Sequence, residues 1–156
     1  MKQPRSAEAE IQIHVVDRQE DCPGWTNWDA LTAFLHESLK PYEDTPADIR
    51  RGIADAFEER DGHRGFVLIA EVRERPAGVL VMLRTGMRGY VPENLLLFLA
   101  VAPHVRGRRI GQRLVRRALE LTDGSVKLHV EHDNPAKQLY EHLGFQSKYA
   151  DMRYVR

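Results

Sequence analysis

The chain has 156 residues, the length of one ordinary domain and enough to bury a substantial core. Lysine plus arginine number 23, and aspartate plus glutamate also number 23, so no overall charge attracts the protein to nucleic acid or to an anionic membrane. We therefore expect a single domain over residues 1–156 that binds neither.

Cysteine usage and the first residues bear on the cellular setting. Cys22 is the only cysteine, so no intrachain disulfide can form, and the first residues lack the apolar segment of a signal peptide. No apolar stretch approaches the roughly 20 residues that cross a bilayer. These features predict a cytoplasmic protein. His129 and His132 are the histidine pair that most suggests a metal, but no cysteine or carboxylate cluster completes a site, so we expect none.

The first part of the chain predicts one strand and two helices. Apolar residues alternate with polar ones over residues 10–16, which is typical of a strand. The segment 25–39 follows and carries a helical stripe made of Trp28, Leu31, Leu35 and Leu39. A second helix begins at Thr45, which suits the N-cap, has Pro46 in its first turn and continues through Phe57.

The middle of the chain predicts a hairpin and a buried strand. Gly65–Arg73 and Gly78–Thr85 have the composition of strands, joined by a turn at Glu74-Arg75-Pro76-Ala77. The apolar strand Leu95–Val101 follows. It leads through a glycine-containing turn over residues 102–111 into a periodic helix.

That turn gathers unpaired backbone N–H groups, as a phosphate or pyrophosphate requires. A P-loop would need Lys-Ser or Lys-Thr after its last glycine, but Gly111 is followed by Gln112 and Arg113. A Rossmann site would need G-x-G-x-x-G, and Gly107 and Gly111 do not have that spacing. The turn therefore indicates either another anion-bearing cofactor or an ordinary tight connection.

The last part of the chain predicts a short strand and a short helix. Residues 126–131 alternate with period two, and His129 lies on the face opposite the buried one. In the helix that follows, Asn134 suits the N-cap, Pro135 the first helical position and Gly144 the C-terminal stop. One face of this helix carries Ala136, Leu139, Tyr140 and Leu143.

Two segments together resemble the GNAT superfamily of N-acetyltransferases, which transfer an acyl group from coenzyme A to an amine. Arg106–Gly111 resembles the pyrophosphate motif Q/R-x-x-G-x-G/A, and Asn134–Phe145 resembles the signature N-x-x-A-x-x-L-Y-x-x-x-G-F. The residues Leu139, Tyr140, Gly144 and Phe145 fall where that signature expects them, whereas Ala136 comes one position early. The resemblance is sharp over Leu95–Phe145.

The resemblance implies an α/β GNAT fold, with a mixed, mostly antiparallel sheet flanked by about four helices and a splay between strands four and five. The expected order is strand, two helices, three strands, helix, strand, helix and a C-terminal strand. Only residues 146–156 follow Phe145, fewer than the family's usual hairpin takes. We expect either a partner subunit, as in a homodimer, or a very tight turn near Tyr149-Ala150 to complete that edge.

The resemblance also implies acetyl-CoA as cofactor and a primary amine of a small molecule, peptide or protein as acceptor. The pantetheine arm then pairs with the backbone of Leu99, Ala100 and Val101, and Asn134 either holds this arm or orders its own turn. Arg109 stands where the family has glycine, and because arginine resists a positive φ we expect a helical conformation there, with its guanidinium near the phosphates. The remaining phosphate-binding candidates are Arg106, Gly107, Arg108, Ile110 and Gly111.

The resemblance assigns acid and base roles as well. Tyr140 resembles the family's general acid, which protonates the departing thiolate. For the base, Glu93 precedes a strand at a level where several members place a carboxylate. His129 lies where others carry glutamate, and an imidazole accepts a proton near neutral pH. Water alone or Glu131 is the remaining alternative.

Acceptor specificity in the family comes from the first two helices and the loop between strands three and four, which here are residues 25–60 and 85–92. Two functions remain open: an acyl-CoA-dependent N-acetyltransferase, and a catalytically idle module that binds CoA or a partner protein. Trp25, Trp28, Tyr42 and Tyr90 are candidates for a pocket wall, and Glu43, Asp44 and Glu93 are candidates for attracting a cation. The alternatives are that Trp28 lies in the core and that Glu43 and Asp44 are solvated.

Overall fold

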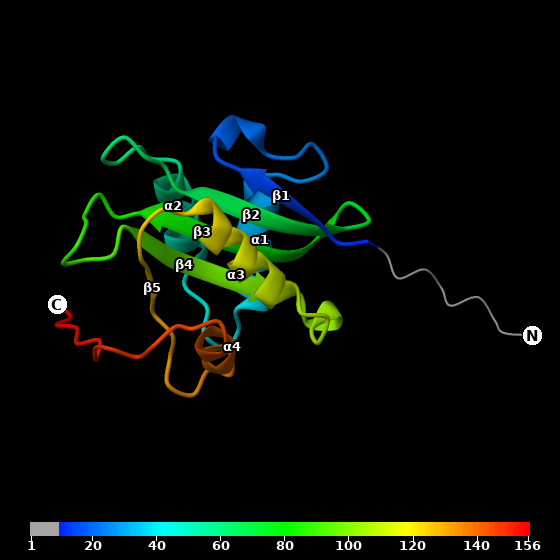
Figure 1. The fold of residues 1–156 in the computed structure, drawn as a ribbon. Helices are drawn as coiled ribbons and strands as arrows, with labels where there is room; N and C mark the ends of the chain where they lie inside the picture. The colour runs from blue at the N-terminus through cyan, green and yellow to red at the C-terminus, as the bar shows by residue number, and fades with distance from the viewer. Residues whose placement is uncertain (1–9) are drawn as a thin grey trace, which may run out of the picture.

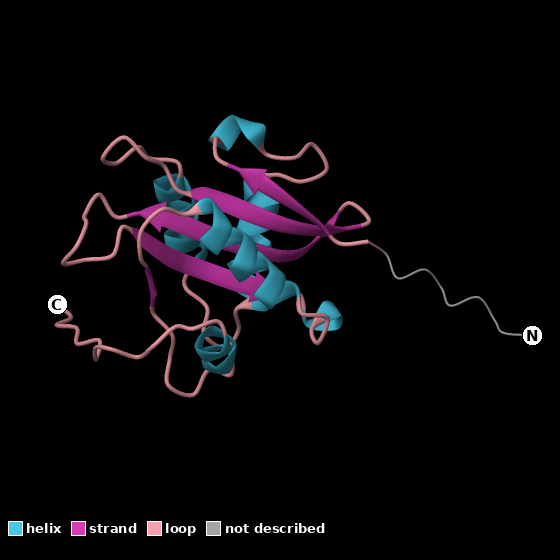
Figure 2. Ribbon diagram, in the orientation of Figure 1, coloured by secondary structure: helices cyan, strands magenta, loops and turns pink. Residues whose placement is uncertain are grey.

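A computed structural model describes residues 10–156 as one sheet with helices against both of its faces (Figures 1 and 2). Short 3-10 turns precede α1 at Gln19–Asp21 and α3 at Pro103–Val105. The elements in chain order are β1 (Gln12–Val16), α1 (Trp28–Ser38), α2 (Pro46–Ala56), β2 (Phe66–Val72), β3 (Arg75–Arg84), β4 (Asn94–Val101), α3 (Ile110–Leu121), β5 (Val126–Leu128) and α4 (Ala136–His142).

The sheet has the order β1-β2-β3-β4-β5, with antiparallel pairs up to β4 and a parallel pair between β4 and β5. This mixed, mostly antiparallel sheet with four helices confirms the predicted fold class. Helices α1 and α2 bury Leu31, Leu35 and Ile49 against one face, and α3 buries Ile110 and Leu114 against the other. Figure 1 shows α4 apart from both layers, beside the lower end of β5.

A β-bulge marks the point at which β5 leaves the sheet. Strand β3 pairs Val81 with Phe98 and Met82 with Leu96, so Leu97 is the extra residue of β4. Strand β5 pairs with β4 only as far as Leu96. On the other side, a Cβ added to Gly52 of α2 would lie 2.5 Å from Leu97 Cδ2, so a larger residue there would force the Leu97 side chain to shift.

The predicted hairpin is correct, but its turn is misplaced. Val72 pairs with Arg75, so the turn is the two-residue segment Arg73–Glu74, at φ 52° and 58°. Two positive φ values match the twist of the flanking strands, and this fit outweighs the lack of glycine. Pro76 lies within β3, where a bulge at Ala70/Glu71 interrupts the pairing and accommodates a residue that lacks an N–H.

The predicted C-terminal strand is wrong for the described residues, because no strand follows α4. The outer edge of the sheet is β5, which has three residues and offers few backbone partners to a further strand. The tail therefore stays irregular, and Tyr149, Met152, Tyr154 and Val155 are each more than 80% exposed. Completion of this edge by a partner subunit stays a prediction.

Candidate functional site

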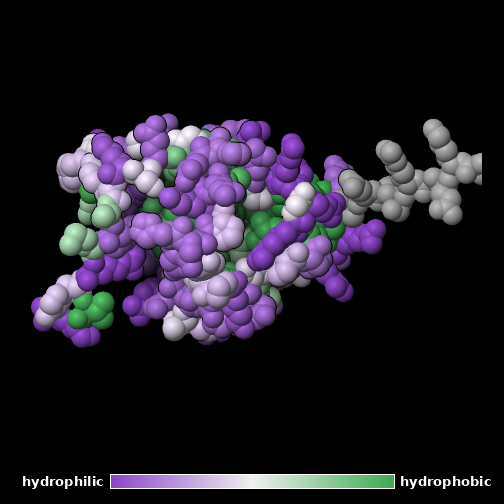
Figure 3. Space-filling view, turned by 90° about the horizontal axis from the view of Figure 1, so that it is seen from below, coloured by the Kyte–Doolittle hydropathy of each residue, from purple (hydrophilic) through white to green (hydrophobic). Residues whose placement is uncertain are grey.

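The outer edge of β4 opens beyond Leu96. Because β5 ends at Leu128 while β4 continues to Val101, no strand in the described part of the chain lies beside Leu97–Val101 on that side. This opening confirms the predicted splay. Seen from below, on the side where α4 lies, Figure 3 shows a hydrophobic area at the surface bounded by hydrophilic residues. An extended ligand can therefore pair with the backbone of Leu99, Ala100 and Val101 as a strand would.

The turn between β4 and α3 has two left-handed residues. Gly107 lies at φ 86°, and Arg109, the N-cap of α3, at φ 60° and ψ 26°. The prediction of a helical Arg109 is therefore wrong. A left-handed arginine costs roughly 1–2 kcal/mol, whereas burying the next residue, Ile110, contributes about 1.5–3 kcal/mol. Ile110 is 2% exposed in the core, so tertiary packing overrides the backbone preference of Arg109.

The first turn of α3 presents unpaired donors. No side chain caps this helix, so the N–H groups of Ile110, Gly111 and Gln112 have no acceptor within it. A Cβ added to Gly111 would lie 3.3 Å from Leu139 Cδ2 of α4 and 3.6 Å from Val101 Cγ2 of β4. The donors thus lie where α3, α4 and the open end of β4 meet, which suits an anionic group.

The guanidinium of Arg106 does not point freely into this turn. Its Nη2 donates to the carbonyl of Ser38 at 3.0 Å, and its Nε donates to the carbonyl of Val101 at 3.3 Å. Arg106 therefore ties the end of α1 to the end of β4. Among the groups described for this turn, the backbone N–H groups are the stronger candidates for phosphate contact.

Replacing Arg109 with glycine should stabilise the protein. The change removes a left-handed strain of roughly 1–2 kcal/mol but adds the greater chain entropy of glycine, about 0.5–1 kcal/mol, so we expect a net gain of up to about 1 kcal/mol. Gly107→Ala, which forces a Cβ into φ 86°, should cost about 1 kcal/mol instead. Urea unfolding measures both, and a loss of stability in Arg109→Gly would contradict the strain.

Short-range hydrogen bonds fix both ends of helix α4, which carries Tyr140. Asn134 Oδ1 accepts the N–H of Ala136 at 2.9 Å, although the N-cap position itself is Pro135 rather than the predicted Asn134. At the other end Gly144 lies at φ 97°, and the N–H of Phe145 donates to the carbonyl of Tyr140 at 3.0 Å, which forms a Schellman motif. The rings of Phe145 and Tyr140 meet edge to face at 5.7 Å.

Tyr140 belongs to the core cluster that includes Ile110 and Leu114 of α3. The preceding residue, Leu139, lies beside the first turn of α3, so α4 packs next to the open side of β4. Burial raises the pKa of Tyr140 to about 12. The phenol therefore keeps its proton throughout the neutral and mildly alkaline range, although burial also makes it a weaker acid than a free tyrosine.

This raised pKa predicts a loss of stability in alkali. A tyrosine ionises near pH 10 in the unfolded chain and near pH 12 in the folded one, so ionisation favours unfolding as the pH rises above about 10. Two pKa units correspond to about 2.7 kcal/mol, lost fully only above about pH 12. Urea unfolding of wild type and Tyr140→Phe between pH 9 and 12 isolates this contribution. Parallel losses in both proteins would contradict it.

Glu93 lies at the opposite end of β4 from the splay. It precedes Leu97 by four residues, about 13 Å along a strand. Its carboxylate accepts the N–H of Ser125 at 2.7 Å and that of Gly89 at 3.4 Å. Hydrogen bonds from its own N–H and from Ser125 lower the pKa of Glu93, which makes the carboxylate a weaker base. The geometry gives Glu93 a role in anchoring the loop after β3.

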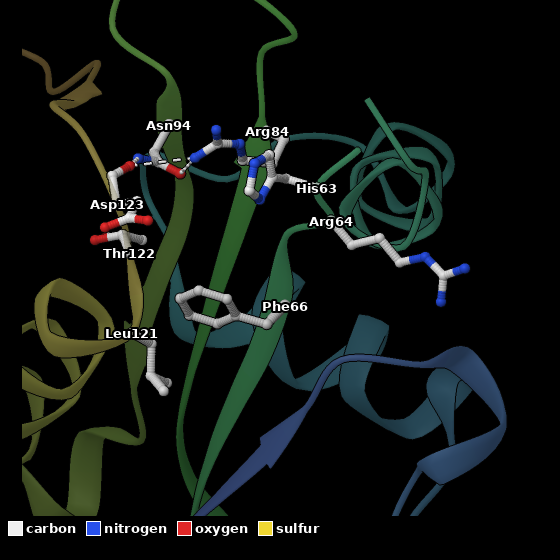
Figure 4. A pocket seen from close by; sticks show the side chains of 8 residues that line it. All are labelled: His63, Arg64, Phe66, Arg84, Asn94, Leu121, Thr122 and Asp123. Atoms are coloured by element: carbon white, nitrogen blue, oxygen red, sulfur yellow. Dashed lines mark hydrogen bonds between the residues drawn. The ribbon is translucent and has the colours of Figure 1, made fainter. Parts of the chain in front are cut away.

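The same end of the sheet holds a cavity of about 110 Å³ (Figure 4). Arg84 donates to Asn94 Oδ1 at 3.1 Å and to the carbonyl of Asp123 at 3.2 Å, and Asn94 Nδ2 donates to that carbonyl at 2.6 Å. These bonds fix the start of β5 beside β4. The lining residues are His63, Arg64, Phe66, Arg84, Asn94, Leu121, Thr122 and Asp123.

His129 is the first residue after β5, beside the opening of the splay. Its side chain is 51% exposed, and its Nε2 lies 3.4 Å from Asp151 Oδ2 in the C-terminal tail. Sequence reasoning missed this contact, because 21 residues without any pairing signal lie between the two.

The four candidate aromatic residues do not gather into one wall, and Trp28 packs against the core, as its alternative interpretation predicts. Trp25 packs against His14 with ring centroids 5.9 Å apart, and Trp28 packs against Phe57 at 5.2 Å, both on the α1/α2 side of the sheet. Tyr90 is 87% exposed in the loop after β3. Of the four aromatic residues only Tyr42 joins the segments that follow β5, because its hydroxyl donates to the carbonyl of Asp133 at 3.3 Å.

Carboxylates surround this contact. Burial and the charges of Asp133 and Glu131 raise the pKa of Tyr42. Glu43 follows Tyr42, and within residues 10–156 its Oε2 is the one buried side-chain oxygen or nitrogen that has no hydrogen-bond partner. An unpaired buried carboxylate oxygen is costly, so this segment suits a cationic donor.

Two further features bear on the class of protein. The described residues contain no group of three or more histidine, cysteine or acidic side chains that could hold a metal ion. None of the helices within residues 10–156 is long and apolar enough to span a membrane.

Comparison with known proteins gives the family. Residues 63–147, more than half of the chain, match the family model described as an acetyltransferase (GNAT) domain. The chain therefore belongs to the GNAT acetyltransferase family. No curated protein sequence matches it.

Solved structures share the fold. The aminoglycoside N-acetyltransferase AAC(6')-Iy in complex with CoA is 14% identical, with a TM-score of 0.66 and 99% of both chains covered. An aminoglycoside acetyltransferase from an uncultured soil metagenomic sample is 19% identical, with a TM-score of 0.66, and covers 94% of this chain and 99% of its own. A GNAT-family acetyltransferase from Streptococcus pneumoniae TIGR4 is 15% identical, with a TM-score of 0.64 and coverage of 94% and 98%. At these identities the likeness concerns the fold alone.

Proposed function

We propose that the protein is an N-acetyltransferase that moves an acetyl group from acetyl-CoA to a primary amine by direct attack. The observation that carries this proposal is the convergence at Gly111 of the α3 donors, the open β4 edge and the helix of Tyr140. When bound, acetyl-CoA supplies a thioester that an amine can attack and a sulfur that needs a proton on leaving.

Each part of the site has a task in this reaction. The N–H groups of Ile110, Gly111 and Gln112 bind the pyrophosphate, supported by the positive end of the helix dipole. The backbone of Leu99–Val101 pairs with the pantetheine arm, and one N–H of this edge polarises the thioester carbonyl. Asn134 fixes the start of α4, so that Tyr140 can donate its proton to the sulfur.

The acceptor enters from the side of Tyr42, where carboxylates gather. A protonated amine is attracted to the negative charge of Glu131 and Asp133 beside Tyr42, and to that of the neighbouring Glu43. Two of the acetyltransferases with the same fold are named for aminoglycosides, which are cationic amines. Their names support a cationic acceptor here. A small cationic molecule or a peptide with a primary amine fits this chemistry.

The base is assigned to His129. Before its lone pair can attack, the amine must lose a proton, so kcat/KM should rise with pH through the titration of the base. We expect His129→Ala to flatten this rise near neutrality and Glu93→Gln to preserve it, since the Glu93 carboxylate is occupied by backbone N–H groups. Exchanged outcomes would assign the base to Glu93, and unchanged profiles in both variants would leave the task to water or Glu131.

Isothermal titration calorimetry with acetyl-CoA tests the proposal at its first step. We expect saturable binding that weakens as salt rises, because the phosphate contacts lie at a solvent-exposed turn. The absence of heat and of a thermal shift at millimolar acetyl-CoA would overturn the proposal. Binding without transfer to any amine would instead indicate the catalytically idle module.

A further inference from the structure

The C-terminal tail contributes a side chain to the opening of the splay. After α4 the chain runs back toward the side of the molecule on which β5 lies (Figure 1). There Asp151 Oδ2 lies 3.4 Å from Nε2 of His129. This ion pair links the tail to the residue at which β5 leaves the sheet.

Asp151 is itself held in place. Arg153 donates from Nε to Asp151 Oδ1 at 2.9 Å and from Nη2 to Oδ2 at 3.1 Å, a two-pronged contact that fixes the plane of the carboxylate. Arg153 also feels the charge of Asp44 from the loop between α1 and α2. The tail thus lies between that loop and His129, on the side where the acceptor enters.

We propose that Asp151 is a positioning residue that orients His129 toward the acceptor amine. This inference rests on the proposed function. The carboxylate of Asp151 lies beside Nε2 of His129, so Nδ1 is the ring nitrogen on the side away from Asp151, and we assign Nδ1 to the amine. The proton that leaves the ammonium bonds to Nδ1, and the carboxylate of Asp151 stabilises the imidazolium until solvent takes that proton.

The charged side chains around the His129 imidazole determine in which direction each substitution should act. Asp151 contacts His129 from the tail, Arg153 and Lys127 act on Asp151, and Glu131 follows His129 by two residues. Removing Asp151 leaves the imidazolium with less negative charge nearby, so His129 should lose its proton at lower pH. Removing Arg153 withdraws a competing cation, so His129 should keep its proton to higher pH.

NMR titration of the His129 ring in the free protein measures this directly. We expect Asp151→Asn to lower the midpoint by a few tenths of a pH unit, the scale of a half-exposed ion pair, and Arg153→Gln to raise it. Asp151→Glu should restore the wild-type midpoint. Glu120→Gln removes an exposed carboxylate that pairs with Arg117 on α3 and serves as the matched control, with no change expected. Equal midpoints in all variants would overturn the proposal.

The pH dependence of kcat/KM for the amine is the second readout. In Asp151→Asn the acidic limb should move down by the same amount as the NMR midpoint, and kcat should fall several-fold while KM for acetyl-CoA stays unchanged. An acidic limb of kcat/KM that stays in place while the NMR midpoint of His129 moves would overturn the positioning role. Failure of wild type to bind acetyl-CoA in calorimetry would overturn the proposed function and this proposal with it, whereas binding with an unresponsive His129 would overturn this proposal alone.

Discussion

Gly111→Asp should abolish measurable acetyl-CoA binding at concentrations that saturate the wild type. The new carboxylate lies in the first turn of α3, among the unpaired N–H groups proposed to hold the pyrophosphate. Bringing like charges together there costs several kcal/mol, and about 3 kcal/mol corresponds to roughly 100-fold in Kd. Calorimetry with acetyl-CoA measures the loss.

Packing and charge must be separated in this experiment. A Cβ at residue 111 would already lie 3.3 Å from Leu139 Cδ2, tighter than an ordinary contact. Gly111→Ala introduces that Cβ without the charge, and we expect it to reduce affinity far less than Gly111→Asp. Equal losses in both variants would show that the shape of the turn matters and that its charge does not.

Tyr140→Phe should keep acetyl-CoA affinity and slow turnover by about 10²–10⁴-fold, the usual contribution of a positioned general acid. The ring stays in place against Phe145, and only the proton donor is lost. Because the pKa of Tyr140 is about 12, loss of its proton should not limit the wild-type rate below about pH 11. Single-turnover kinetics and calorimetry on the same preparation measure the two quantities.

A tyrosine without contact to the site gives the control. Tyr154 is 86% exposed in the tail, and Tyr154→Phe should leave both affinity and turnover unchanged. Equal turnover in wild type and Tyr140→Phe would return Tyr140 to a packing role in the core.

The parts of the fold that the sequence predicts are those with strong local chemistry. Thr45 caps α2 and Pro46 opens it, as expected. Gly144 ends α4 because its positive φ permits the Schellman bonds. The strand Leu95–Val101 also lies within the bounds of β4, since its long apolar run has no polar interruption.

The errors arise where distant contacts decide the local structure. Arg109 is left-handed because Ile110 must enter the core, and nothing in the local sequence reveals that burial. The hairpin turn at Arg73–Glu74 follows from the twist of two paired strands rather than from glycine. Asp151 reaches His129 from an irregular tail, and no period or motif predicts such a contact.

The candidate site residues also fall into two groups, those placed by a local motif and those placed by distant contacts. The turn before α3 lies beside α4 and β4, Tyr140 shares a core cluster with α3, and Asn134 bonds to the start of α4. Glu93 lies near this site in sequence, but its strand carries it to the other end of the sheet. Position along a strand, rather than proximity in sequence, therefore separates the two base candidates.

Release of free thiol from acetyl-CoA in the presence of a panel of primary amines tests the central claim most directly. The account predicts thiol release that depends on both the amine and the enzyme, that is fastest with cationic acceptors and that falls in Tyr140→Phe. Thiol release that never exceeds the rate without amine, across the whole panel and with acetyl-CoA bound, would contradict the claim that this GNAT protein transfers acetyl groups to amines.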